Sequence, residues 1–186
     1  MRLKNCLSRH LKTLYKKEGV MIVISPKEQI SLIADDIRTK YSTSFPVNVI
    51  EIANNLGLKV YTYNEKNPNI SGMLNANKKE IFINENDLPL RQKFSIAHEI
   101  GHWVLDYKSI APQKDIFEIS YRNVISKQEL KEVRANHFAA CLIMPEEETK
   151  KAWALNNYDI DDTAKYLSVS RSALTFRLDN LGLLNE

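Results

Sequence analysis

Residues 94–102 have the sequence FSIAHEIGH, which places His98 and His102 four positions apart in the chain. We predict that this segment belongs to a helix over residues 87–107. Gly101 in the middle of such a helix costs about 1 kcal/mol relative to alanine. A glycine there indicates that a second helix packs closely against this face.

The pattern formed by His98, Glu99 and His102 is H-E-x-x-H. Residues four apart on a helix lie on one face, with Cβ atoms about 5–6 Å apart. Two imidazoles in that arrangement can bind one zinc ion at bond lengths of about 2.0–2.1 Å. Glu99 lies beside this pair, off the line of the ligands, so its carboxylate can act on a water molecule at the metal. The pattern therefore predicts a zinc site with an adjacent general base.

A zinc site of this kind needs a third protein ligand. The helix predicted over residues 126–144 offers Glu129, Glu132 and His137. Glu129 already completes a capping box at the start of that helix. Glu132 heads a stripe of small and apolar side chains at spacings of three or four, which suits close packing at Gly101. We therefore expect Glu132 to be the third ligand. The stripe consists of Ala135, Asn136, Ala139, Ala140 and Ile143.

The other segments predict an α+β fold that is mostly helical. A helix is expected to begin at Pro26, because Ser25 and Glu28 can form a capping box around its first turn. A short helix follows Pro46 and ends at Gly57. Alternating or apolar runs further on predict a small three-stranded antiparallel sheet. The predicted strands are residues 58–63, 70–74 and 80–84.

Charge is distributed unevenly along the chain. The net charge is +3, but residues 1–20 alone carry +5, which leaves the remainder at −2. The body of the protein therefore lacks the strong positive charge of a nucleic-acid-binding protein. We divide the chain into a basic N-terminal extension (1–24), a zinc domain (25–156) and a helix-turn-helix-like helical tail (157–186). Residues 108–125 show no regular period.

Composition places the chain among ordinary globular proteins, with 44% hydrophobic and 26% charged residues. The longest apolar run, residues 138–144, is far shorter than the about 18 residues of a membrane span. The two cysteines, Cys6 and Cys141, do not indicate a disulfide framework. We therefore expect the protein to reside in the cytoplasm.

Two segments of the chain resemble the ImmA/IrrE family of zinc metallo-endopeptidases. The first is residues 94–102, and the second is residues 132–145, with the pattern E-x-x-A-N-x-F-A-A-x-L-I-M-P. Residues 52–57 and 71–84 also fit, so the resemblance covers about residues 28–145. It implies a zincin-like fold in which the zinc domain is a metallopeptidase.

The resemblance also implies roles for individual residues. His98, His102 and Glu132 are expected to bind one zinc ion per chain, with Glu99 as the catalytic base. The expected substrate is a helix-turn-helix transcriptional repressor, whose cleavage relieves repression in a mobile element or a stress response. These roles for His98, Glu99, His102 and Glu132 agree with those inferred from the residues themselves.

Further roles in the reaction can be expected from position. Asn136 lies one turn beyond the third ligand and is a candidate for orienting a metal ligand. Tyr107, Tyr121 and His137 are candidate donors to the oxyanion, and the sequence does not rank them. The strand at residues 80–84 precedes the active helix and is expected to pair with extended substrate backbone.

The C-terminal tail supports a different function. Its apolar spacing matches a helix-turn-helix, with Arg171, Ser172 and Thr175 early in the second helix, which in such motifs reads DNA. The alternative is therefore a DNA-binding regulator with the zinc domain as sensor or partner-binding module. Residues 158–186 have a net charge of −2, however, whereas phosphate binding requires positive charge. DNA binding is thus not the expected function, and the intact Glu99 argues against a purely structural zinc domain.

Overall fold

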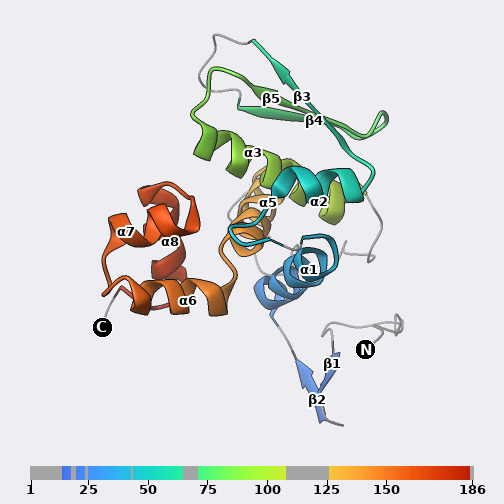
Figure 1. Ribbon diagram of the computed structural model, residues 1–186. Helices are drawn as coiled ribbons and strands as arrows, with labels where there is room; N and C mark the ends of the chain where they lie inside the picture. Colours follow the sequence, from blue (N-terminus) through green and yellow to red (C-terminus); the bar gives the residue numbers. More distant parts are fainter. Residues whose placement is uncertain are drawn as a thin grey trace.

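The computed structural model describes residues 14–17, 20–23, 25–42, 44–64, 71–107 and 126–184. The fold is α+β and mostly helical, as predicted, and a small sheet lies along one side of the helix that contains HEIGH (Figure 1). The elements in chain order are β1 (Leu14–Lys17), β2 (Val20–Val23), α1 (Pro26–Tyr41), α2 (Val49–Asn55), β3 (Lys59–Tyr63), β4 (Gly72–Asn75), β5 (Glu80–Asn84), α3 (Pro89–His102), the π-helical turn η1 (Trp103–Tyr107), α5 (Lys127–Ile143), α6 (Glu146–Leu155), α7 (Ile160–Leu167) and α8 (Arg171–Asn180).

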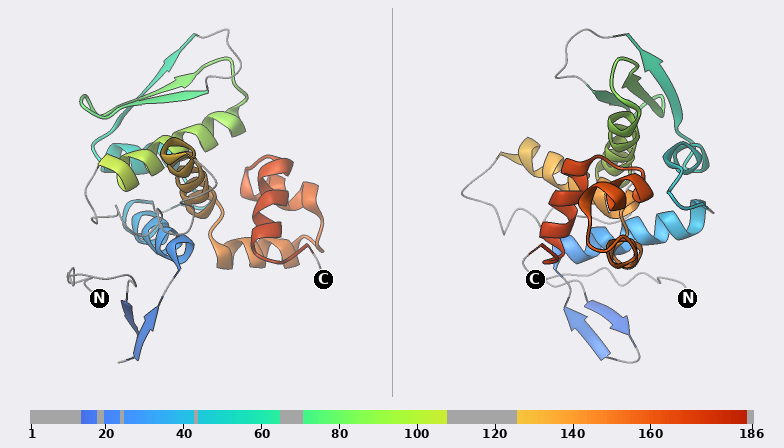
Figure 2. Two further views of the ribbon diagram at one scale, coloured as in Figure 1. Left: turned by 180° about the vertical axis from the view of Figure 1, so that it is seen from behind. Right: turned by 60° about the vertical axis from the view of Figure 1, so that its left-hand side comes forward.

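The helices are stacked around α5. Helix α3 packs against α5, and α1 packs against it as well, so that α5 lies between them (Figures 1 and 2). The sheet covers the side of α3 that faces away from α5. This layering places the HEIGH segment between the sheet and the helix that carries the expected third ligand.

Both predicted capping boxes form. At the start of α1, the Ser25 amide donates to Glu28 Oε2 at 2.6 Å, and the Glu28 amide donates to Ser25 Oγ at 3.2 Å. Ser126 and Glu129 make the same pair of bonds at the start of α5. Glu129 is therefore occupied by the cap, as expected, because its carboxylate satisfies a backbone N–H that the helix itself leaves open.

The sheet differs from the prediction in one respect. Its strand order is β3-β5-β4, with β5 antiparallel to β4 but parallel to β3, so the sheet is mixed. The prediction of an entirely antiparallel sheet is wrong because β3 pairs with β5 instead of its neighbour in the chain. The chain reverses direction twice between β3 and β5, so these two strands point the same way. β5 is central, and its Ile81 and Ile83 are buried against the helices.

Gly101 has the role expected from the sequence. A methyl group built at Gly101 would lie 3.1 Å from Phe138 Cδ1 and 3.2 Å from the Ala135 backbone of α5. Backbone atoms cannot move aside as a flexible side chain can, so a larger residue would push α3 and α5 apart. The lost helix propensity of about 1 kcal/mol is thus offset by close packing between the two helices that carry the site.

The tail helices α7 and α8 pack on the rest of the protein. Leu167 and Leu174 are fully buried in the same hydrophobic core as α3 and α5. Arg177 is itself buried and donates from Nε to the Met144 carbonyl at 3.0 Å. Lys93 of α3 donates to the carbonyl of Ser168, which ends α7, at 3.3 Å. The division of the chain at residues 156 and 157 stays a prediction.

Some of the segments and residues considered in the sequence lie outside the part of the chain that the structure describes. Residues 108–125 and Cys6 lie outside the described residues, while Cys141 is buried and not in a disulfide. In the part of the chain that the structure describes, no helix combines the length and the apolar character needed to cross a membrane.

Candidate metal centre

Three side chains converge between α3 and α5. His98 and His102 come from α3, and Glu132 comes from the second turn of α5. The Nε2 atoms of the two histidines are 3.0 Å apart. The Glu132 oxygens lie 3.2 Å from His98 Nε2 and 3.5 Å from His102 Nε2. The residues predicted as metal ligands thus meet, and among the described residues they form a group suited to a metal ion.

Hydrogen bonds at Nδ1 determine which nitrogen of each ring is available. His98 Nδ1 is 2.9 Å from Asn136 Oδ1, and His102 Nδ1 is 3.1 Å from Asp106 Oδ2. An amide oxygen and a carboxylate oxygen only accept, so each Nδ1 must donate its proton there. Each neutral ring then presents a lone pair at Nε2, and the two lone pairs face one another. A metal ion placed between them could accept both lone pairs.

The geometry of the three donors fits zinc. Two imidazole nitrogens and one carboxylate are a donor set found at catalytic zinc sites, and adjacent ligands of a tetrahedral zinc lie about 3.3 Å apart. The three donor separations, from 3.0 to 3.5 Å, bracket that value. The Glu132 side chain is 43% exposed, so the site opens to solvent on one side. A fourth position for water or substrate is therefore accessible.

The partner of His102 was not identified from the sequence. Asp106 lies on η1 with its side chain 8% exposed, and its Oδ1 is 3.6 Å from Arg134 Nη1. Arg134 follows Glu132 by two residues on α5, so this ion pair connects the two helices that supply the donors. The four-residue spacing of His98 and His102 continues to Asp106, and this repeat was the available signal. A buried carboxylate between a histidine and an arginine is positioned to orient the histidine.

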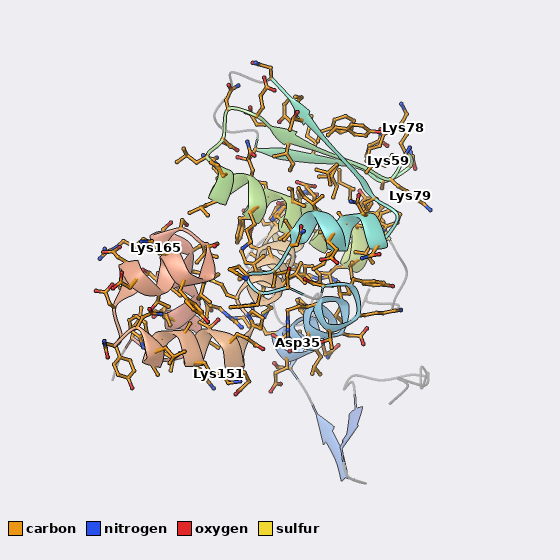
Figure 3. The ribbon with its side chains drawn as sticks, in the orientation of Figure 1. Asp35, Lys59, Lys78, Lys79, Lys151 and Lys165 are labelled. Atoms are coloured by element: carbon orange, nitrogen blue, oxygen red, sulfur yellow. The ribbon has the colours of Figure 1, made fainter. Side chains whose placement is uncertain are left out.

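We expect Asp106→Asn to weaken zinc binding by about 10–100-fold without unfolding the protein. An amide accepts a hydrogen bond less strongly than a carboxylate, and its NH2 group can favour the wrong tautomer of His102. Zinc competition against a chromophoric chelator measures the affinity, and the visible spectrum of the Co²⁺ form reports the ligand geometry. Asp35→Asn on α1 (Figure 3) is the control, because Asp35 also pairs with an arginine, Arg38, but does not contact a metal donor in any hydrogen bond or ion pair that the structure records. Equal affinities for the two variants would contradict a positioning role.

Glu99 lies next to the donors but faces the sheet. Its residue exposure is 7%, and a methyl group built at Gly72 of β4 would lie 3.1 Å from Glu99 Oε1. The missing side chain of Gly72 therefore makes room for this carboxylate. Burial raises the pKa of Glu99 from 4.5 to about 7, with the charge of His102 opposing the shift and that of Glu132 adding to it. A carboxyl with this pKa can take up and release a proton near neutral pH.

The two histidines have different pKa shifts. Burial lowers the pKa of His98, and the neighbouring His102 lowers it further. Burial also acts to lower the pKa of His102, but the Asp106 hydrogen bond and the nearby charges of Glu132 and Glu99 outweigh it and raise the pKa. His98 is therefore neutral at neutral pH, which is the form that binds a metal.

Of the three candidate oxyanion donors, His137 is turned toward α1 and away from the metal donors. Its Nε2 lies 3.2 Å from the Lys27 carbonyl and 3.3 Å from Ser31 Oγ. Tyr107 is 57% exposed at the end of η1. Tyr121 lies outside the described residues. The contacts of His137 with α1 indicate a structural role for this side chain.

The expected pairing of substrate with residues 80–84 is corrected by the sheet topology. This strand is β5, which has β3 on one side and β4 on the other, so neither of its edges is available. Among the described strands, β3 and β4 each have β5 as their single partner, so each has an open edge. The first residue of β4, Gly72, lies beside the Glu99 carboxylate. Of the two edge strands, β4 is thus the one that lies beside Glu99.

No curated protein matches the chain. Among solved structures, the chain is similar to a Mycobacterium tuberculosis transcriptional regulator, with a TM-score of 0.65 and 17% identity over 81% of this chain. The match covers 46% of that regulator, so this chain spans about half of its length. A likeness at this level of identity shows the fold.

The sequence matches the Peptidase_M78 family, described as the IrrE N-terminal-like domain, over residues 53–179. This region is more than half of the chain and includes the HEIGH segment, α5 and the tail helix α7. The resemblance noted from the two sequence segments is confirmed. The chain therefore belongs to the IrrE N-terminal-like family of metallopeptidases.

Proposed function

We propose that the protein is a zinc-dependent endopeptidase that cleaves a helix-turn-helix transcriptional repressor in the cytoplasm. His98, His102 and Glu132 hold one zinc ion, and Glu99 is the general base. The observation that carries the proposal is the convergence of three metal donors beside a buried carboxylate, in a member of a peptidase family. Cleavage would relieve repression of a mobile element or a stress response.

The reaction needs proton transfers that this chain's residues can perform. Zinc supplies Lewis acidity, which polarises the scissile carbonyl and lowers the pKa of a water molecule toward about 7. Glu99 accepts a proton from the attacking water on a carboxylate oxygen and delivers it to the nitrogen of the leaving amine. Asn136 and Asp106 orient the rings of His98 and His102 through their Nδ1 atoms.

The substrate has to be extended where it is cut. A peptide paired with the open edge of β4 would pass beside Glu99, because Gly72 at the start of β4 contacts that carboxylate. A regular helix hides its carbonyls in its own hydrogen bonds. The repressor must therefore present an extended or locally unfolded segment, which makes cleavage selective for its conformation as well as its sequence.

We assign the peptidase domain to residues 25–156 and a substrate-docking role to the helical tail at 157–186, with 1–24 as a basic extension. Helix α8 supports this role because some of its side chains are exposed to solvent instead of packing against the core. Phe176 is 62% exposed there, while Arg177 beside it is buried. An exposed aromatic ring next to polar side chains is a common feature of protein interaction surfaces.

The alternative function is a DNA-binding regulator. Helices α7 and α8 form two helices joined by a short turn, and Arg171 is exposed at the start of the second. Against DNA binding, Arg171 is paired with Asp161 of α7 and the tail has a net negative charge. A titration of duplex DNA at increasing salt discriminates the two functions. Tight binding that weakens steeply with salt would favour the regulator.

The test of the proposed function uses the helix-turn-helix repressor encoded nearest to this chain. Purified repressor is mixed with the zinc-loaded protein, with the metal-stripped protein and with Glu99→Gln, and its mass is followed over time. Cleavage by the zinc-loaded wild type alone is expected. If the repressor stays intact while an unrelated unfolded protein is digested, the protein is a general peptidase and the repressor is not its substrate.

A further inference from the structure

A hollow lies beside β4, one to three residues from the point where this strand contacts Glu99. Its volume is about 470 Å³, which lies within the range of sites that bind small ligands. Two of its lining side chains are well exposed, Met73 at 47% and Tyr107 at 57%. The lining residues are Met73, Leu74, Asn75, Ala76, Asn77, Phe82 and Tyr107.

The walls of the hollow indicate what it can hold. Met73 pairs with Phe82 across the sheet, and both side chains are on the face away from α3, whereas Leu74 is on the face toward the core. A hollow with walls from both faces of one strand must lie around the edge of that strand. The β4 edge is open among the described strands. An extended peptide beside β4 would therefore run through the hollow.

The distance to Glu99 places the hollow within the reach of a bound substrate. Gly72 contacts the Glu99 carboxylate, and β4 continues from there through Met73 to Asn75. With a rise of about 3.3 Å per residue, these three positions span about 10 Å. A side chain bound in the hollow therefore belongs to a residue within about three positions of the bond beside Glu99.

The hollow has an apolar wall formed by Met73 and Phe82, beside the amides of Asn75 and Asn77, and the apolar wall can hold an apolar side chain. Phe82 stacks on Tyr61 with ring centroids 5.6 Å apart, which holds its ring as a rigid wall. Met73 is flexible and polarisable, so it can adapt to large apolar groups of different shape. Lys59, Lys78 and Lys79 lie together at the same end of the sheet (Figure 3) and are exposed. Glu80 lies beside Lys59 in the sheet, so the three lysines leave a net positive charge at this end, which disfavours a basic side chain there.

We propose that this hollow binds a large apolar side chain of the substrate, located within about three residues of the cleaved bond, and that Met73 and Tyr107 determine this preference. The inference rests on the proposed peptidase function. It adds a sequence requirement to the conformational one, namely an extended segment with one large apolar residue and no basic residue beside it.

The test selects peptides from a random phage-displayed library on the zinc-loaded Glu99→Gln protein, which binds peptides without cutting them. Selected peptides are expected to carry Leu, Ile, Met or Phe at one fixed position, with few basic residues nearby. Met73→Lys in the same background is expected to select Asp or Glu at that position. A local loss of structure cannot produce such a reversal. Leu155→Lys, at a 72% exposed apolar residue on α6, should select the same peptides as the parent.

A second measurement separates this inference from the proposed function. Unfolded β-casein is digested with the zinc-loaded wild type and with zinc-loaded Met73→Lys, and the cleavage sites are mapped by mass spectrometry. The rate of cleavage next to large apolar residues is expected to be lower by about tenfold or more in the variant. Cleavage that depends on Glu99 but shows no preference for apolar residues would contradict the role proposed for the hollow and would support the peptidase function. A peptide preference that depends on Met73, without any cleavage that depends on Glu99, would support the role proposed for the hollow and would contradict the peptidase function. Recovery of no peptides, or of the same peptides by Met73→Lys, would also overturn the hollow.

Discussion

Replacing Glu99 with glutamine is expected to lower kcat/KM for the cleaved repressor by about 10²–10⁴-fold. Glutamine keeps the shape of the side chain, but its amide cannot accept a proton from water or return one to the leaving amine. The measurement is a time course of repressor mass with the zinc-loaded wild type and variant at equal concentration. Turnover of the variant at the wild-type rate would show that Glu99 is not the base.

Two further measurements separate loss of the base from loss of structure. Glu99 is not one of the three donors, so Glu99→Gln should retain zinc. In the metal-free protein the raised pKa of Glu99 makes stability depend on pH, because the folded state favours the protonated form. That contribution is fully present below about pH 4.5 and is lost as the pH rises through about 7. Metal-free Glu99→Gln should therefore melt higher than wild type at pH 8 but not at pH 4.5.

Replacing Glu132 with alanine is expected to lower zinc affinity by more than the about 10–100-fold lost with an outer-shell partner. The variant lacks one of three protein donors, and the two Nε2 atoms of His98 and His102 cannot complete the site alone. Catalysis should be lost along with the metal. Competition titration with a zinc chelator measures the affinity, and elemental analysis gives the zinc content of the purified protein.

The fold should tolerate this change, because the Glu132 side chain is 43% exposed and is not part of the hydrophobic core. Glu147→Ala removes another exposed carboxylate, in the first turn of α6, and controls for the change in net charge. Zinc affinity equal in the two variants would remove Glu132 from the site and require a third donor from elsewhere.

Local structure was predictable where it depends on close neighbours in the chain. The capping boxes that begin α1 and α5 involve residues three apart, such as Ser25 and Glu28, and both form as predicted. His98 and His102 lie side by side because residues four apart, about one turn, are on the same face of a helix. Gly101 correctly indicated close packing between helices, because a glycine in the middle of a helix lowers that helix's own stability and is favoured only where another element needs the space.

The direction of the strands was predicted less well. Residues 58–63 and 80–84 were correctly expected to be strands, but a strand pattern carries no information on which neighbour it pairs with. The parallel pairing of β3 with β5 joins residues more than 20 positions apart in the chain. This pairing makes β5 central and leaves β4 at the edge. A central strand has no free edge, so the expected pairing of residues 80–84 with substrate was wrong.

The sequence by itself determined that His98 and His102 lie together with Glu99 beside them, because helical periodicity places residues four apart on one face of one element. The family was evident from the two motifs that the chain shares with its members. Only the tertiary structure decided that Asp106 and Arg134 link the two helices of the site, and that Gly72 makes room for Glu99. The hollow beside β4 also became visible only there. Each of these features depends on how separate elements lie against one another, and that is set by packing of the whole core instead of by any local pattern.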